Sequence, residues 1–248
     1  MQTPAVPHLP EPDPSPRKVA ITYGDDNYRA QRDILARELR ALNMFDLVRV
    51  YTPGSMSADF RDFFAPYRNQ RGGGFFIWKP YICIEATKNM FEGEYLLYID
   101  AGCSIRSDQR SRLDDYFEMA RTSPSGILCF QMTHLPERDW TKADTFAHLG
   151  LALDGPEAIR GQLIGTCWVL CLNPHSRQLL AEWYDIARHH THLFTDIPST
   201  LPNAPSFREN RHDQSAWSLL NKRAGSTAIA DETYGPAARV LLATRRRG

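Results

Sequence analysis

The chain lacks an excess of charge of either sign. Its 248 residues include 29 Lys and Arg and 29 Asp and Glu, so the formal net charge is zero with neutral histidines. Proteins that bind the phosphates of nucleic acid normally carry a basic excess. We therefore expect no nucleic acid among the partners, and we interpret the basic cluster Arg245–Arg247 as a solvated tail.

Long apolar runs are missing as well. No stretch approaches the roughly 20 consecutive apolar residues that a transmembrane helix requires. The first residues do not combine a basic segment with an apolar one, as a secretory signal would. The sequence therefore predicts no transmembrane segment and a cytoplasmic location, either free or peripheral at the inner face of the membrane.

Cysteine is scarce, and the common active-site signatures are absent. The five cysteines are an odd number in mostly apolar surroundings, so we expect reduced, buried thiols. The sequence has no P-loop, no Gly-x-Ser-x-Gly elbow and no His-Glu-x-x-His pair. These absences argue against P-loop enzymes, serine hydrolases built on that elbow and zinc proteases.

The composition changes after the first residues. Residues 1–17 contain six prolines and few large apolar side chains, so they are predicted to form a disordered tail outside the fold. The length of the chain fits one large α/β domain or two small ones. We favour a single catalytic domain over residues 18–248.

The order of the apolar segments predicts an α/β fold. Residues 18–51 have the pattern of a strand, a helix and a strand, which implies a parallel pair with a right-handed crossover. Further strands are predicted up to Asp100 and at 127–132, 167–172 and 227–230. Helices are predicted at 57–64, 80–89, 110–122, 142–149 and 174–189, and from Asp213 onward.

One strand ends on an acidic residue. The run YLLYIDAG is apolar up to Asp100, which is followed by the small residues Ala101 and Gly102. Open α/β sheets bind ligands at the carboxyl ends of their strands, and small residues leave space against the backbone. Asp100 is therefore a candidate ligand-binding residue, with an ordinary Asp-containing turn as the alternative.

Two further segments concentrate polar groups. In RGGGFFIWKPY, three glycines allow backbone amides to approach an anion, and Arg71 and Lys79 supply positive charge. The alternative is a flexible loop with a solvated Lys79. In RENRHDQS, the density of hydrogen-bonding groups suits a ligand rich in hydroxyls. Here the alternative is that Asp213 caps a helix while Arg211 and His212 are exposed.

Together these segments resemble the GT-A group of nucleotide-sugar glycosyltransferases. The likeness is to bacterial proteins, often tied to surface polysaccharide, that carry R-G-x-G-x-x-x-W-K-P, Y-x-D-A-G and R-H-D-Q-S segments, and it covers about residues 18–235. The resemblance implies a GT-A-like, Rossmann-like α/β fold: a mixed, mainly parallel sheet flanked by helices in a single domain. It also implies a nucleotide-sugar donor and a glycan or lipid-linked acceptor.

The resemblance assigns the metal position only in part. GT-A enzymes hold a divalent metal through an Asp-x-Asp, and here Asp100 matches the first Asp while Gly102 stands at the second. Asp100 could hold Mn²⁺ or Mg²⁺ with Asp213 or His212 acting through water. Alternatively, Arg71 and Lys79 could neutralise the donor diphosphate without a metal.

The remaining site residues also come from the resemblance. Asp213 and Gln214 resemble the Asp-Gln pair that contacts the donor sugar in glycogenin-like members, and the loop 23–27, with Tyr23 and Asp25, is where such folds hold the nucleotide. The donor-binding set is then Tyr23, Asp25, Arg71, Lys79, Asp100, Gly102, His212 and Gln214. Arg71, Lys79, Asp213 and Gln214 are expected to converge on Asp100, because the loops at the carboxyl ends of several strands gather in one crevice.

We expect the chain to transfer a sugar from a nucleoside diphosphate to a hydroxyl group. Asp100 and Asp213 are the candidate catalytic residues, and Asp213 is the first candidate for the base that an inverting enzyme needs, ahead of Asp144 and Glu137. The stereochemistry stays open. The alternatives are a nucleotidyltransferase acting on sugar phosphates, which normally has a basic loop where this chain has the acidic turn 24–27, and a non-catalytic carbohydrate- or nucleotide-binding protein of the same fold.

Overall fold

A computed structural model describes residues 15–244 of the chain. Most of the predicted tail, residues 1–14, and the basic cluster Arg245–Arg247 lie outside the described residues. Among residues 15–244, no helix combines the length and apolar character that crossing a membrane would take. All five cysteines are free and buried, as the sequence predicts.

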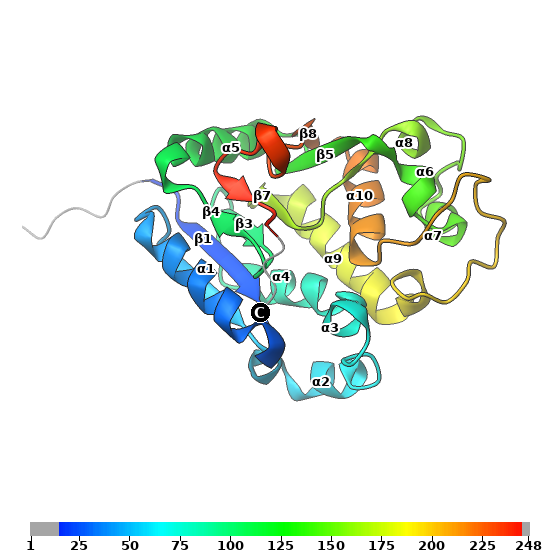
Figure 1. Ribbon diagram of the computed structural model, residues 1–248, viewed down its shortest axis with the longest axis horizontal. Coiled ribbons are helices and arrows are strands. Elements are labelled where there is room, and N and C mark those ends of the chain that lie inside the picture. The colour runs from blue at the N-terminus through cyan, green and yellow to red at the C-terminus, as the bar shows by residue number, and fades with distance from the viewer. Residues whose placement is uncertain (1–14, 245–248) are drawn as a thin grey trace, which may run out of the picture.

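The centre of the molecule is a seven-stranded mixed sheet in a single domain (Figure 1). Its order is β2-β1-β3-β7-β5-β6, with β8 paired to β5. Strands β1, β2, β3, β5 and β8 run in one direction, while β6 and β7 are reversed. The expected mixed, mainly parallel sheet is confirmed. The strands are β1 (Lys18–Tyr23), β2 (Leu47–Tyr51), β3 (Tyr95–Ile99), β5 (Ile127–Pro136), β6 (Gly161–Leu163), β7 (Cys167–Cys171) and β8 (Thr227–Ala230).

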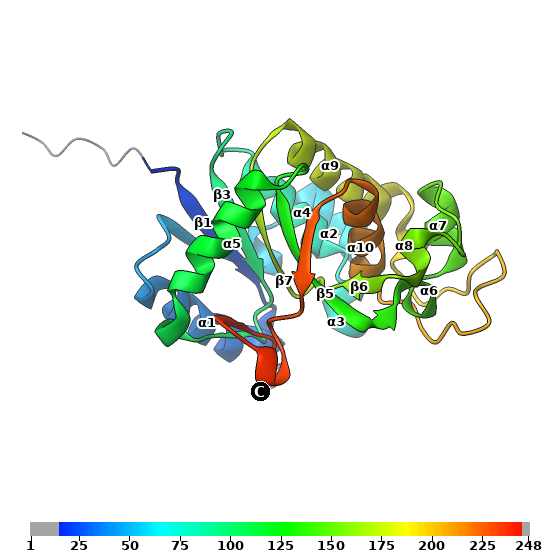
Figure 2. The same ribbon diagram turned by 90° about the horizontal axis from the view of Figure 1, so that it is seen from above.

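Helices cover both faces of the sheet (Figures 1 and 2). One apolar cluster joins the sheet to α1 and α5, and a second joins the opposite face to α4, α9 and α10. This gives three layers with the sheet in the middle, as expected for a strand pattern interrupted by amphipathic helices. The longer helices are α1 (Arg29–Ala41), α2 (Ala58–Phe64), α4 (Trp78–Thr87), α5 (Ser111–Thr122), α9 (Pro174–His189) and α10 (Asp213–Arg223).

Local sequence explains where several elements begin. Ser57 accepts a hydrogen bond from the Phe60 amide at the start of α2. Asn173 and Ser176 form a reciprocal capping box at α9, and Pro174 stands in its first turn. These elements therefore begin within a residue or so of where the sequence predicts them.

Several short elements were not predicted, namely α3 (Arg71–Phe75), α6 (Glu137–Trp140) and α8 (Pro156–Ile159). The helix expected at 142–149 is confirmed as α7 (Ala143–His148). A separate two-stranded sheet pairs β4 (Ser104–Ile105) with β9 (Leu241–Leu242). Just after β9, the Thr244 hydroxyl donates a hydrogen bond to the Gly102 carbonyl over 2.9 Å, which brings this distant segment beside the end of β3.

Candidate functional site

A pocket of about 350 Å³ opens where β1 and β3 end. Its walls come from the loop after β1, from α3 and the start of α4, from the turn after β3, from residues 165–166, and from residues 209 and 211–214. Apart from the two weaker base candidates, the residues that the sequence nominated for the site all line it, and they are Tyr23, Asp25, Arg71, Lys79, Asp100, Gly102, His212, Asp213 and Gln214. The loops of a sheet with these strand directions meet at this edge, which is why distant segments share one pocket.

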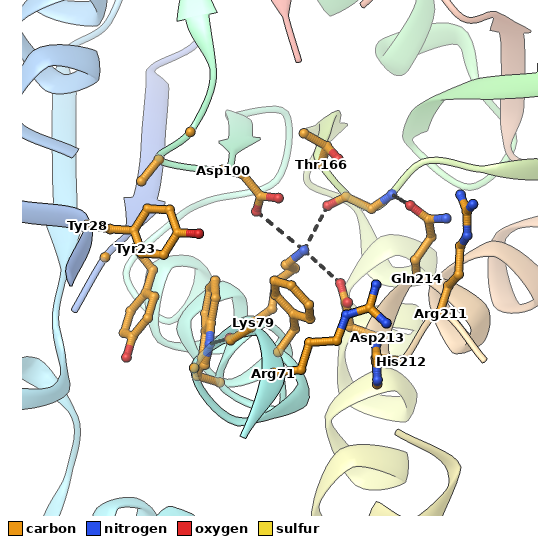
Figure 3. A pocket seen from close by; sticks show the side chains of 18 of the residues that line it. Tyr23, Tyr28, Arg71, Lys79, Asp100, Thr166, Arg211, His212, Asp213 and Gln214 are labelled. Atoms are coloured by element: carbon orange, nitrogen blue, oxygen red, sulfur yellow. Dashed lines mark hydrogen bonds and ion pairs between the residues drawn. The ribbon is translucent and has the colours of Figure 1, made fainter. Parts of the chain in front are cut away.

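Lys79 lies at the centre of this pocket (Figure 3). Its ammonium is 2.7 Å from Asp213 Oδ2 and 3.4 Å from Asp100 Oδ1, and it donates to the Gly165 carbonyl over 3.0 Å. The side chain is only 3% exposed. Burial disfavours the ammonium, but the two carboxylates outweigh it and the pKa of Lys79 is raised. The interpretation of Lys79 as a solvated side chain is therefore wrong.

Asp100 presents a carboxylate to the pocket. Its amide donates to the Thr166 carbonyl over 2.9 Å, which anchors the turn after β3. Its Oδ1 accepts a hydrogen bond from the Tyr98 hydroxyl and pairs with Lys79. The side chain is 26% exposed, and within residues 15–244 its Oδ2 stays open to the pocket. Burial beside this carboxylate raises the pKa of Tyr98, so that the phenol keeps its proton.

The side chain of Asp213 is more deeply buried than that of Asp100. Its side chain is 4% exposed, and burial raises its pKa to about 6, an effect that Lys79 opposes and Asp100 reinforces. It is the first residue of α10, whose N-cap is His212 with no side-chain cap hydrogen bond. The interpretation of Asp213 as a simple helix cap is therefore wrong, because its carboxylate faces Lys79.

The two weaker base candidates lie elsewhere. Asp144 accepts hydrogen bonds from the amides of Thr200 and Leu201, and these bonds help to lower its pKa to about 2 although burial opposes them. Glu137 is fully buried and pairs with Lys222 over 2.7 Å. Neither lines the pocket. Both belong to the packing of the chain, and neither can serve as the base at this site.

Gln214 is fixed at both ends of its amide. Its Oε1 accepts from the Gly165 amide over 2.9 Å, and its Nε2 donates to Gln162 Oε1 over 2.5 Å. Gln162 in turn donates to the buried Glu137 over 2.9 Å. A Cβ on Gly165 would lie 3.1 Å from Asp213 Oδ2, so glycine leaves room for the carboxylate. Gly165 and Gln162 carry no motif in the sequence, and sequence reasoning missed both.

His212 is buried, contrary to the alternative that left it exposed. Its Nε2 lies 2.9 Å from Asp196 Oδ1, and its ring stacks on Phe75 with centroids 5.2 Å apart. Burial lowers the pKa of His212, although Asp196 opposes this effect. The backbone of His212 has φ 53° and ψ −123°, a region that residues with a side chain rarely adopt. The strain lies directly beside Asp213.

The glycine run forms a left-handed turn. Residues 72–76 all have positive φ, and Phe76 has φ 58° and ψ 19°. A Cβ on Gly72 would lie 2.3 Å from the Phe76 ring, so this position requires glycine. The Trp78 indole donates to the Gly72 carbonyl over 3.2 Å and stacks on Tyr23 with centroids 3.9 Å apart. These contacts make the turn one wall of the pocket.

The charges at the pocket mouth are loosely held. Arg71 pairs with Glu209 over 3.3 Å, and their side chains are 61% and 43% exposed. An exposed pair of this kind contributes little to stability, about 0–1 kcal/mol. Asp25 lies beside the glycine run, 3.5 Å from where a Cβ on Gly73 would stand, and accepts a hydrogen bond from the Asn27 amide over 3.0 Å.

The residues present do not fit the divalent metal that the resemblance implies. Within residues 15–244, no group of three or more His, Cys, Asp or Glu side chains is arranged to hold a metal ion. Gly102 offers no side-chain oxygen, and the Lys79 ammonium lies 3.4 Å from Asp100 Oδ1. A second cation beside that carboxylate would meet electrostatic repulsion.

Comparisons with known proteins give matches among solved structures alone. No protein-family model and no curated protein sequence matches the chain. The galactosyltransferase LgtC, in complex with donor and acceptor sugar analogues, aligns over 87% of this chain and 74% of its own, with a TM-score of 0.48 and 14% identity. A glycosyltransferase involved in glycosylation of the major capsid of PBCV-1 aligns over 92% and 94%, with a TM-score of 0.49 and 7% identity. Mouse xyloside xylosyltransferase 1, in its apo form, aligns over 88% and 85%, with a TM-score of 0.42 and 8% identity.

Proposed function

We propose that this protein is a GT-A-type glycosyltransferase that moves a sugar from a nucleoside diphosphate to a hydroxyl of a glycan or lipid-linked acceptor, in the synthesis of bacterial surface polysaccharide. The observation that carries the proposal is the cluster of Lys79, Asp100 and Asp213 in a pocket at the carboxyl ends of β1 and β3. Crevices at this position in open α/β sheets bind nucleotides and related ligands.

The walls of the pocket suit the parts of such a donor. Tyr23 and Trp78 offer a stacked aromatic pair, and Asp25 adds a carboxylate beside it, which suits a nucleotide base and ribose. Asp100 Oδ2 faces the pocket, where it can accept hydrogen bonds from hydroxyls of the sugar. Gln214 keeps one amide proton beyond its bond to Gln162, and this proton is available to the same sugar.

The reaction breaks the bond between the anomeric carbon and a phosphate oxygen and forms one to the acceptor oxygen. Negative charge develops on the departing diphosphate, so a positive group must face it. The acceptor hydroxyl loses a proton. Asp213, with a pKa raised to about 6 by burial, is the candidate acceptor of that proton if the configuration inverts.

A panel of nucleotide sugars tests the proposal. UDP-, GDP-, dTDP- and ADP-sugars are titrated calorimetrically, and release of free nucleotide is followed with oligosaccharide acceptors. We expect binding and turnover with at least one donor. Asp100→Asn keeps the shape of the side chain and removes its charge, so turnover should fall by about tenfold or more, equivalent to about 1.4 kcal/mol.

Asp108→Asn is the matched control, because Asp108 is exposed and pairs with Arg106 outside the pocket. Its turnover should equal that of the unaltered protein. Absence of binding to every donor would contradict the proposal. Binding without turnover would favour the non-catalytic alternative, and release of pyrophosphate from a nucleoside triphosphate and a sugar phosphate would favour the nucleotidyltransferase.

A further inference from the structure

The Lys79 ammonium has the surroundings of a bound metal ion. Its contacts are Asp213 Oδ2 at 2.7 Å, Gly165 O at 3.0 Å and Asp100 Oδ1 at 3.4 Å. Carboxylate and main-chain carbonyl oxygens are the ligands that Mg²⁺ and Mn²⁺ bind in proteins. One of these contacts is a hydrogen bond to a carbonyl and two are ion pairs, and the lysine side chain is only 3% exposed. A metal ion could enter this place only by displacing a buried lysine.

The neighbouring groups do not provide a second metal position. Asp100 Oδ1 already accepts a hydrogen bond from Tyr98, and His212 Nε2 is engaged by Asp196. Gly102 has no side chain where the resemblance expects a second carboxylate. Among these neighbours Asp100 Oδ2 is the oxygen left for a metal, and within residues 15–244 no group of three or more His, Cys, Asp or Glu side chains is arranged to hold one.

Lys79 is also a poor partner for the phosphates of a donor, because its side chain is only 3% exposed and its ammonium already pairs with two carboxylates. The other cations lining the pocket are Arg71 and Arg211. Arg211 lies over the Trp140 ring, 4.0 Å from its centroid. Arg71 is held by Glu209 at 3.3 Å, and both side chains are largely solvated. Replacing the contact of Arg71 with Glu209 by one with a phosphate would therefore cost little free energy.

We propose that this protein binds a nucleoside diphosphate without a divalent metal. Lys79 fills the place of the metal between Asp100 and Asp213, and Arg71 leaves Glu209 to bind the diphosphate. The inference rests on the proposed function. Guanidinium and phosphate groups form two parallel, charge-assisted hydrogen bonds, whereas the Arg71–Glu209 pair has a single contact.

Calorimetric titration with UDP and GDP, in EDTA and in Mn²⁺, tests metal independence. We expect dissociation constants within about threefold of each other in the two media. Arg71→Gln should weaken nucleotide binding by about tenfold, because it removes one charge-assisted contact with the phosphates. Glu209→Gln should tighten it by about two- to fivefold, because Arg71 no longer has a competing partner. Arg68→Gln, an exposed arginine outside the pocket, is the control and should bind like the unaltered protein.

The outcomes separate this inference from the proposed function. Binding that is lost in EDTA and restored by Mn²⁺ would overturn metal independence while leaving the transferase intact. Weaker binding by Glu209→Gln would overturn the exchange of Arg71 between two anions. Absence of UDP and GDP binding in both media would overturn this inference, whereas the proposed function fails when no donor of the wider panel binds.

Lys79→Ala tests the place of the ammonium directly. The substitution leaves two carboxylates and the Gly165 carbonyl around an open position, so Mn²⁺ should raise the melting temperature of this variant. The melting temperature of the unaltered protein should not respond to Mn²⁺. A rise in the unaltered protein, or no rise in the variant, would contradict the inference that Lys79 occupies a metal-like position.

Discussion

Replacing Lys79 with methionine would remove the ammonium and keep a side chain of similar length. Asp213, which is 4% exposed, would lose the contact at 2.7 Å that balances its charge, and the Gly165 carbonyl would lose a donor. Breaking a buried ion pair by removing one partner costs about 3–5 kcal/mol, because the other charge stays buried without compensation. We expect a loss of that size in the free energy of unfolding at neutral or higher pH.

The loss should depend on pH. Burial raises the pKa of Asp213 to about 6 from an ordinary value of 3.8. A raised folded-state pKa contributes stability that is fully present below the unfolded-state value and is lost as pH rises through about 6. The difference of about two units corresponds to about 3 kcal/mol. Since Lys79 lowers this pKa, its removal raises the value further, and the penalty of Lys79→Met should be larger at pH 8 than at pH 5.

Urea unfolding at pH 5 and pH 8 measures both effects. Lys79→Met with Asp213→Asn removes the buried charge as well and should recover at least half of the loss at pH 8. Lys88→Met is the matched control, because Lys88 is exposed and pairs with Glu85 one turn away. A loss below about 1 kcal/mol at pH 8, or the same loss at both pH values, would refute the reasoning.

Two further substitutions test the walls of the pocket. Gly72→Ala places a Cβ 2.3 Å from the Phe76 ring at φ +65°, so it should lower the melting temperature and weaken nucleotide binding more than Gly225→Ala, which has a similar φ of +66° and no atom within 4 Å. Equal effects of the two would contradict the role of the Phe76 contact. Gln162→Met leaves the Gln214 amide without its buried acceptor, and we expect about 1–3 kcal/mol of lost stability in urea and a lower kcat. A stability loss with unchanged kcat would restrict Gln162 to packing.

The sequence by itself determined the longer elements of the fold, while short ones such as α3, α6 and α8 were not predicted. An apolar run such as 167–172 becomes a buried strand, and a cap followed by proline starts α9, because these signals act over a few neighbouring residues. It also nominated the pocket. Asp100 ends a strand and Asp213 starts a helix, and the ends of such elements gather at one edge of an α/β sheet whatever lies between them.

Tertiary structure alone decided how these side chains pair. The motif around Lys79 was compatible with a solvated lysine or with one that binds phosphate, yet the lysine is buried between Asp100 and Asp213. Gln214 has its partner in Gln162, which no local pattern marks. Ion pairs and hydrogen bonds form over about 3 Å. Here the packing of α4 and α10 against the sheet brings segments far apart in the chain to that distance. No local stretch of sequence encodes this packing.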